Sequence, residues 1–259
     1  MKYTLKAENP IAVIDSGVGG ISVLRELIKV MPNENFIFFG DSINAPYGTK
    51  SVEEVRRLTT ESAEHLFEEG CKGLVIACNT ATSAAARYLR ELYPEIPLVG
   101  IEPAIKPACF CAEHPTILAM ATPMTIREEK FQRLMARFDE EADIIPLPCP
   151  GLMDFVERGD LDGEDLRKYL TELFYEFRDI HIDAVVLGCT HYPFVGKMIQ
   201  NVLGENVKLF DGGEGTAREM KRRLEAAGLR NPSETVGTVE IRNSKDEKKV
   251  ELCKMLLKD

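Results

Sequence analysis

The chain has 259 residues, which is enough for one large domain or two small ones, each with its own core. Its hydrophobic content of 44% and charged content of 29% are those of an ordinary soluble protein, and a formal net charge of −10 argues against a broad nucleic-acid-binding surface. The amino-terminal segment is too polar for a signal peptide and no apolar run reaches the roughly 20 residues of a membrane span, so we expect a cytoplasmic protein with no membrane or nucleic-acid partner.

Short apolar runs alternate with amphipathic helical patterns over the first hundred residues. The expected strands are 11–15, 36–41, 74–78 and 96–101. The expected helices are 20–31, 51–70 and 82–92. In the second of these helices, Ser51 and Glu54 form a capping box and Gly70 marks the end. This alternation predicts βαβ units around a mostly parallel sheet.

The same pattern restarts near residue 103. The expected strands are 116–122, 143–147, 184–189, 206–211 and, in the tail, 235–243. The expected helices are 126–138, 151–159, 163–180, 194–203, 214–228 and 248–257. Because the two halves match in order, we predict an α/β protein with two similar domains. The first is formed by residues 1–102 plus 210–259 and the second by 103–209.

A cysteine ends an apolar strand in each half. Cys78 lies in "KGLVIACNTAT" and Cys189, 111 residues later, lies in "DAVVLGCTHYP". Ligands of open α/β sheets bind at the carboxyl ends of the strands, and a thiol at the start of the following helix is favoured as thiolate. A single buried cysteine is usually a small hydrophobe, but two at equivalent positions favour a function. Two facing thiols would suit a reaction that removes a proton from one face of a molecule and adds one to the other.

Two other patterns suggest different chemistry. Gly17 and Gly19 begin a G-x-G-x-x-G pattern, and Asp41 resembles a ribose-binding acid, but Ser22 stands where the third glycine belongs. These glycines also suit a carboxylate-binding turn or a plain tight turn. The segment "ACFCAEH" has a C-x-C spacing and one histidine, which is a poor zinc pattern. Seven cysteines without a disulfide framework are better explained as reduced thiols.

Four motifs together resemble the glutamate racemase family of cofactor-independent amino-acid racemases. They are "DSGVGG" (15–20), "DSINAPYG" (41–48), "ACNTAT" (77–82) and "LGCTHYP" (187–193), within a match from about residue 11 to 220. The resemblance implies two doubly wound domains with mostly parallel sheets and the active site in the cleft between them. It also implies no cofactor or metal. The tail beyond about residue 230 carries no family motif, and "PMTIREEKF" departs from the family pattern after Thr122.

The resemblance also implies roles for particular residues. Cys78 and Cys189 are the implied acid/base pair, with Asp15 beside the first thiol and His191 and Glu157 beside the second. The implied substrate-binding residues are Asp15, Ser16, Pro46, Tyr47, Gly48, Cys78, Asn79, Thr80, Thr122, Cys189, Thr190 and His191. Since none of the four motifs contains an arginine or lysine, we expect backbone N–H groups, hydroxyls and helix ends to hold the substrate's carboxylates.

We therefore predict a glutamate racemase that works by two-base proton transfer at Cα and supplies D-glutamate for peptidoglycan synthesis, cell wall biogenesis and cell shape. Its partner would be glutamate, and a homodimer is among the assemblies that we expect. Three alternatives stay open at this point. They are an aspartate racemase of the same architecture, a dinucleotide-dependent oxidoreductase, and a non-catalytic amino-acid-binding protein.

Overall fold

The computed structural model describes residues 5–258, which form two compact units. One unit contains the chain up to Glu102 and the segment from Gly213 onward, and the other is Pro103–Gly212. The predicted boundary at residue 210 would cut the strand β8 (Lys208–Asp211), which pairs along its whole length with β7 (Ala184–Leu187) and so belongs to the second unit. Residues 1–4 and 259 of the predicted first domain lie outside the described residues.

The first unit is built on a five-stranded sheet in the order β4-β3-β1-β2-β9. All its strand pairs are parallel, as predicted. Strands β1, β3 and β4 are buried throughout, which explains why they are almost wholly apolar. The strands are β1 (Ile11–Asp15), β2 (Phe36–Gly40), β3 (Gly73–Ile76), β4 (Leu98–Gly100) and β9 (Val239–Asn243).

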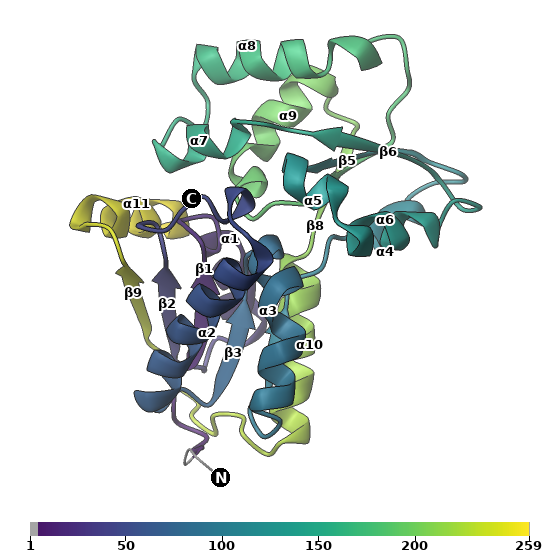
Figure 1. The fold of residues 1–259 in the computed structure, drawn as a ribbon. Helices are drawn as coiled ribbons and strands as arrows, with labels where there is room; N and C mark the ends of the chain where they lie inside the picture. The colour runs from purple at the N-terminus through teal and green to yellow at the C-terminus, as the bar shows by residue number, and fades with distance from the viewer. Residues whose placement is uncertain (1–4, 259) are drawn as a thin grey trace. The chain divides into compact units, whose positions relative to one another are not determined.

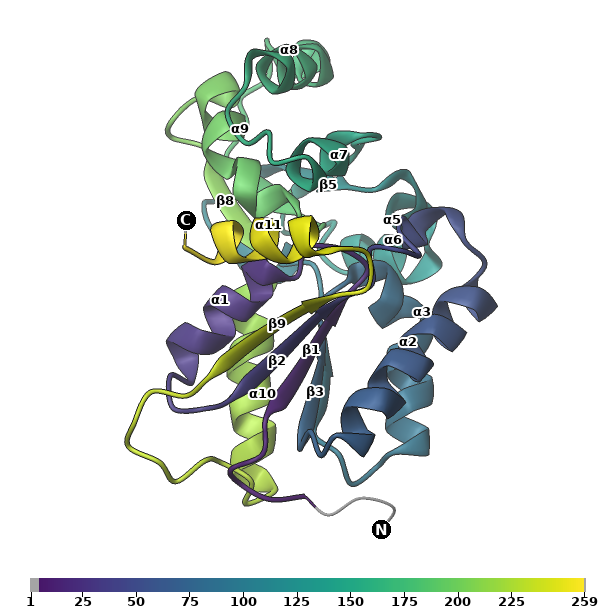
Figure 2. The same ribbon diagram turned by 90° about the vertical axis from the view of Figure 1, so that its left-hand side faces the viewer.

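Helices cover both faces of this sheet (Figure 2). On one face lie α1 (Ile21–Val30), α10 (Gly213–Ala226) and α11 (Glu247–Lys258). On the other lie α2 (Val52–Glu68) and α3 (Asn79–Leu92). The predicted cap of α2 is present, because Ser51 Oγ accepts a hydrogen bond of 3.2 Å from the Glu54 N–H. The core on this side includes Ile14, Leu66, Leu74, Ile76, Ala85 and Leu89.

The second unit repeats this plan on a four-stranded parallel sheet in the order β6-β5-β7-β8. Strands β5, β6 and β8 are labelled in Figure 1. In both sheets, the first four strands of the unit in chain order lie side by side in the same spatial order: the second strand, then the first, the third and the fourth. Its other strands are β5 (Thr116–Ala121) and β6 (Asp143–Pro148). Its helices are α4 (Ile105–Cys109), α5 (Pro123–Arg127), α6 (Glu129–Ala136), α7 (Leu152–Glu157), α8 (Glu164–Leu173) and α9 (Gly196–Leu203). Pro146 and Pro148 are tolerated in β6 because it is an edge strand.

Two predicted helices of the second unit are wrong in detail. The expected helix 126–138 is divided at Glu128, whose backbone is extended (φ −68°, ψ 129°) and which precedes α6. The preceding helix α5 begins earlier than expected, because Thr122 caps it and Pro123 supplies its first residue. The expected helix 163–180 ends at Leu173 and is followed by one 3₁₀ turn, Tyr175–Phe177. Over residues 5–258, no helix has the length and apolar character needed to span a bilayer.

Candidate active site

The shared strand order gives each unit a topological switch point. It lies between β1 and β3 in the first unit and between β5 and β7 in the second, where the chain leaves neighbouring strands in opposite directions. Asp15 ends β1 and Cys78 follows β3, while Thr122 follows β5 and Cys189 follows β7. The predicted residues therefore occupy the place where open α/β sheets bind ligands.

Cys78 is the N-cap of α3, as predicted. Its Sγ accepts hydrogen bonds from Ser16 Oγ at 3.4 Å and from the Ala81 N–H at 3.5 Å. The side chain is buried at 7% exposure. Two donors and the positive end of a 14-residue helix both favour a negative sulfur, so this environment supports a thiolate.

Asp15 lies beside this thiol on the neighbouring strand. The Ala77 N–H donates to the Ile14 carbonyl, which fixes the ends of β1 and β3 side by side. Asp15 is 4% exposed, and its Oδ1 accepts a hydrogen bond of 2.9 Å from the Gly17 N–H. A Cβ at Gly20 would lie 2.6 Å from the Asp15 Cβ. This glycine of "DSGVGG" is therefore explained by the close approach of α1 to Asp15.

The loop 41–48 follows β2 and folds around Asp41. Tyr47 Oη donates to Asp41 Oδ2 at 2.8 Å, and Asn44 Nδ2 contacts both carboxylate oxygens at 3.0–3.1 Å. Burial raises the pKa of Tyr47 well above its usual value, and the negative charge of Asp41 raises it further, so the phenol stays protonated. Neighbouring protein donors thus occupy both oxygens of Asp41, which removes the main support for a ribose-binding role.

In the same loop, Pro46 is exposed, Gly48 is half-buried, and the Ala45–Pro46 peptide bond is cis. Beside Cys78, Asn79 and Thr80 are the first two residues of α3, with Asn79 half-buried and Thr80 buried. The first unit therefore brings together its predicted residues at the carboxyl end of one sheet.

Cys189 is held differently from Cys78, and the prediction that it begins a helix is wrong. It precedes a 3₁₀ turn, Tyr192–Val195, and α9 starts only at Gly196. Its Sγ lies 3.6 Å from His191 Nδ1. On the other side of the imidazole, Nε2 lies 2.9 Å from Glu157 Oε1, at the last residue of α7.

The imidazole of His191 is buried at 2% exposure. Burial alone would lower its pKa, but the hydrogen bonds to Cys189 and Glu157 outweigh burial and hold the pKa well above the usual value. This direction favours the charged imidazolium, in which Nδ1–H can donate to Cys189 Sγ and Nε2–H to Glu157 Oε1.

The remaining predicted residues of the second unit lie at the same sheet end. Thr122 Oγ1 accepts a hydrogen bond of 3.3 Å from the Thr125 N–H, and the two hydroxyls are 3.0 Å apart. Thr190, which lies between Cys189 and His191 in the sequence, is buried. The second unit thus gathers Thr122, Glu157, Cys189, Thr190 and His191 at one end of its sheet.

The other cysteines do not form a competing centre. Within residues 5–258, no group of three or more histidine, cysteine or acidic side chains is arranged to hold a metal ion, and this includes Cys109, Cys111 and His114. No disulfide joins any of the seven cysteines in the part of the chain that the structure describes. Burial raises the pKa of Cys71 to about 12, so this thiol is a protonated core residue.

A cavity of about 560 Å³ lies elsewhere in the second unit, at the amino ends of β7 and β8. Polar groups in its wall already have partners, since His181 Nε2 lies 3.3 Å from Asp183 Oδ1 and Lys208 Nζ donates to the Cys111 carbonyl at 2.7 Å. The cavity is at the opposite end of the sheet from Cys189, so it is not part of the candidate site.

Sequence reasoning missed Asn243 and Ser244, which contact the loop 41–48 from the tail. Only the pairing of β9 with β2 brings them there. Nothing in the local sequence reports which strand an edge strand will join.

Comparison with known proteins identifies the family. Residues 11–220 match the family described as Asp/Glu/Hydantoin racemase. The chain belongs to this family. It is 51% identical to a glutamate racemase of Clostridium perfringens, over 96% of each chain. This confirms the predicted resemblance and the prediction that the chain is a racemase.

Solved structures of family members share the fold. The glutamate racemase of Francisella tularensis in complex with D-glutamate is 27% identical, with a TM-score of 0.82 over 98% of this chain and 95% of that chain. The Escherichia coli glutamate racemase in complex with L-glutamate and the activator UDP-MurNAc-ala is 29% identical, with a TM-score of 0.82 over 96% and 94%. The predicted α/β fold with two parallel sheets is confirmed.

Proposed function

We propose that this racemase interconverts L- and D-glutamate. The proposal is supported by relatives that are named glutamate racemases at about half identity over nearly the whole chain, and by neighbours solved with D-glutamate or L-glutamate bound. The observation that carries it is the pair of thiols, Cys78 and Cys189, at equivalent positions of two sheets with the same strand order. We propose that both act on one bound glutamate.

In the direction from L- to D-glutamate, the Cys189 thiolate takes the proton from Cα. The electron pair of the Cα–H bond stays on the substrate as a carbanion, delocalised into the adjacent carboxylate. The Cys78 thiol then gives its proton to the opposite face of Cα. The enzyme ends with Cys189 as thiol and Cys78 as thiolate, which is the form that accepts D-glutamate for the reverse reaction.

Neighbouring groups set the protonation of each thiol. The imidazolium of His191, held by Glu157, favours the Cys189 thiolate. Asp15 lies beside Cys78 and would favour its protonated form by charge repulsion, opposing the helix terminus.

Substrate binding is assigned to polar groups around the two thiols. The residues proposed to bind glutamate are Asp15, Ser16, Pro46, Tyr47, Gly48, Cys78, Asn79, Thr80, Thr122, Cys189, Thr190 and His191. No cofactor or metal enters this mechanism. We propose that the product supplies peptidoglycan synthesis in the cytoplasm.

The direct test incubates the purified protein with L-glutamate alone, after dialysis against a chelator, and measures D-glutamate by chiral chromatography. We expect D-glutamate to form until the two enantiomers are equal, and we expect Cys78→Ala and Cys189→Ala each to abolish its formation. L-aspartate run in parallel should racemise far more slowly. Activity that returned only with zinc or pyridoxal phosphate, or faster turnover of aspartate, would contradict the proposal.

A further inference from the structure

The tail of the chain reaches the loop 41–48 of the candidate site. Strand β9 is the edge strand of the first sheet and runs parallel to β2, with Asn243 paired opposite Gly40. Because β2 leads directly into the loop, the residues at the end of β9 lie beside the start of the loop. The tail has no family motif, so its sequence alone assigns it no role in the site.

Two consecutive tail residues make four hydrogen bonds to this part of the chain. Asn243 Nδ2 donates to Ser42 Oγ at 2.8 Å, and the Ser244 N–H donates to the Gly40 carbonyl at 2.9 Å. Ser244 Oγ donates to Asp41 Oδ1 at 2.9 Å and accepts from the Ile43 N–H at 2.9 Å. The hydroxyl of Ser244 therefore acts as donor and acceptor within one short stretch of the loop.

Gly40 makes this approach possible. A Cβ at this position would lie 2.4 Å from the Gly17 carbonyl oxygen and 2.8 Å from Asn243 Nδ2. Any other residue would push apart the turn that follows Asp15 and the end of β9. Because Gly40 has no side chain, the end of β9 and the turn after Asp15 can both approach the start of the loop closely.

Asp41 transmits the contact into the loop. It is 5% exposed, and one carboxylate oxygen accepts from Ser244 while the other accepts from Tyr47 Oη at 2.8 Å. Tyr47 is itself 4% exposed. Asn44 Nδ2 also contacts both carboxylate oxygens of Asp41, at 3.1 and 3.0 Å. A buried carboxylate that loses one of its donors is destabilised. Loss of the Ser244 hydroxyl would therefore weaken the support that Asp41 gives to Tyr47 and Asn44.

We propose that Asn243 and Ser244 are positioning residues, which hold the loop 41–48 in the conformation that presents Pro46, Tyr47 and Gly48 to the substrate. They would act through Ser42 and Asp41 without touching glutamate. The inference rests on the proposed function for the role of this loop in binding.

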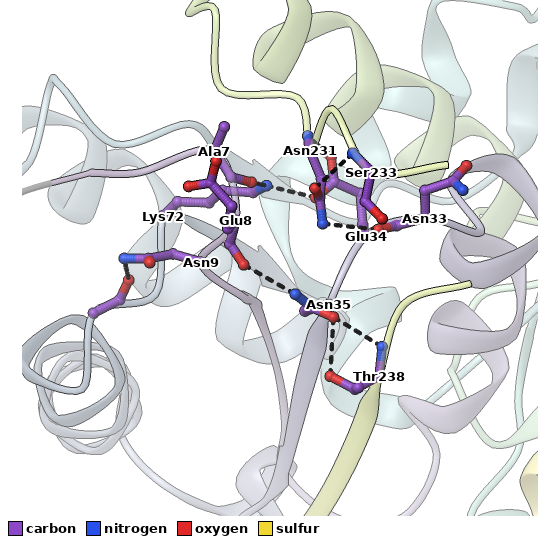
Figure 3. Close-up of polar contacts among 11 residues, drawn as sticks. Ala7, Glu8, Asn9, Asn33, Glu34, Asn35, Lys72, Asn231, Ser233 and Thr238 are labelled. Atoms are coloured by element: carbon purple, nitrogen blue, oxygen red, sulfur yellow. Dashed lines mark hydrogen bonds and ion pairs between the residues drawn. The ribbon is translucent and has the colours of Figure 1, made fainter. Parts of the chain in front are cut away.

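The other end of the tail is attached independently (Figure 3). The Asn231 N–H donates to Glu34 Oε1 at 2.9 Å, and Thr238 donates to Asn35 Oδ1 through both its N–H at 2.9 Å and its hydroxyl at 3.0 Å. These contacts lie at the amino end of β2, some five residues or roughly 16 Å from the loop.

Beyond Ser244, α11 packs on α1 and buries Cys253 and Leu256 completely. Removing one hydroxyl at Ser244 therefore leaves the tail in place. Thr238 is a matched control. Its hydroxyl is on the same tail and also donates a hydrogen bond to the first unit, but it does so at the amino end of β2, away from the loop 41–48.

The test compares Ser244→Ala, Ser244→Thr and Thr238→Val in the full chain. We expect Ser244→Ala to raise KM for glutamate on the order of tenfold, with a smaller change in kcat, because a hydrogen bond to a charged group is lost. Ser244→Thr keeps the hydroxyl and should retain most of the affinity. Thr238→Val should leave KM unchanged.

Hydrogen exchange of peptides that cover residues 41–48 gives a readout independent of activity. In Ser244→Ala the amides of residues 41–48 should lose protection from exchange, while those of β1 and β3 keep theirs. In Thr238→Val the protection of residues 41–48 should be unchanged. An unchanged KM and unchanged protection in Ser244→Ala would overturn the inference, as would equal effects of Ser244→Ala and Thr238→Val. If the wild-type protein did not racemise glutamate, the proposed function would fail, while the exchange result would still decide the role of Ser244.

Discussion

Cys78 and Cys189 occupy equivalent positions, but different residues hold them. Cys78 has a helix terminus and two donors, whereas Cys189 has a charged imidazole that is fixed by a carboxylate. In the proposed mechanism each thiol acts both as acid and as base, in a different environment. The equivalence of the two halves lies in their strand order and not in their side chains.

The pKa of His191 is the most direct residue-level test of this arrangement. In an NMR titration we expect it to lie well above the usual value of about 6.5 and to fall in Glu157→Gln, because a neutral amide no longer favours the imidazolium. His191→Asn would identify the resonance by its disappearance. A wild-type His191 that titrates at or below about 6.5 would contradict the assignment.

The same shift has a consequence for stability. A folded-state pKa above the unfolded value stabilises the fold at pH below about 6.5, and this stabilisation is lost as the pH rises through the folded-state pKa. The difference in free energy of unfolding between wild type and Glu157→Gln should therefore be greatest at mildly acidic pH and shrink at alkaline pH. Denaturant unfolding over that pH range measures it.

Thr190 is expected to bind substrate through its hydroxyl. Thr190→Val should lower kcat/KM by the worth of a hydrogen bond to a charged group, roughly 1.5–3 kcal/mol. The loss must be equal in the two directions, because enantiomers have equal free energies and the equilibrium constant is one. Thr171→Val, in the exposed part of α8, is the control and should have no effect. An unchanged kcat/KM in Thr190→Val would remove Thr190 from the site.

At the scale of elements, much of the fold could be predicted because its strands are short, apolar and regularly spaced between amphipathic helices. The sequence also placed Cys78 at a helix start, since apolar residues before it and small helix formers after it are local signals. It did not reveal the 3₁₀ turn Tyr192–Val195 between Cys189 and α9, because the pattern of apolar residues does not distinguish such a turn from the start of a helix. The break at Glu128 and the partner strand of β9 are likewise not local properties.

One buried ion pair joins several elements of the first unit. Lys72, at the entry to β3, is 0% exposed and donates to Glu34 and to the Ala7 carbonyl (Figure 3). Glu34 also accepts from the Asn231 N–H in the tail. The pair therefore fastens the amino-terminal segment and the tail to the start of the sheet.

Lys72→Met should lower the free energy of unfolding by about 3–5 kcal/mol, because it leaves Glu34 buried without its cation. Adding Glu34→Gln should recover part of the loss. The control is Lys29→Met, which breaks an exposed pair with Glu26 and should cost less than about 1 kcal/mol. Equal losses in Lys72→Met and Lys29→Met, measured by urea unfolding, would show that the buried pair has no special role.

In the whole molecule, the two units have the same strand order, and each supplies one thiol. In each unit the cysteine follows the third strand in chain order, at the switch point of the sheet.

In the proposed mechanism two different thiols serve the two faces of Cα, and incorporation of deuterium from the solvent distinguishes this mechanism from one with a single base. The reaction is run from L-glutamate in D₂O and stopped early, and both enantiomers are separated and analysed by mass spectrometry. Two bases predict that the D-glutamate carries solvent deuterium at Cα while the recovered L-glutamate carries almost none. D-glutamate that kept the original hydrogen, or L-glutamate that exchanged without inversion as fast as the product formed, would show a single base acting on both faces and would rule out the two-thiol mechanism.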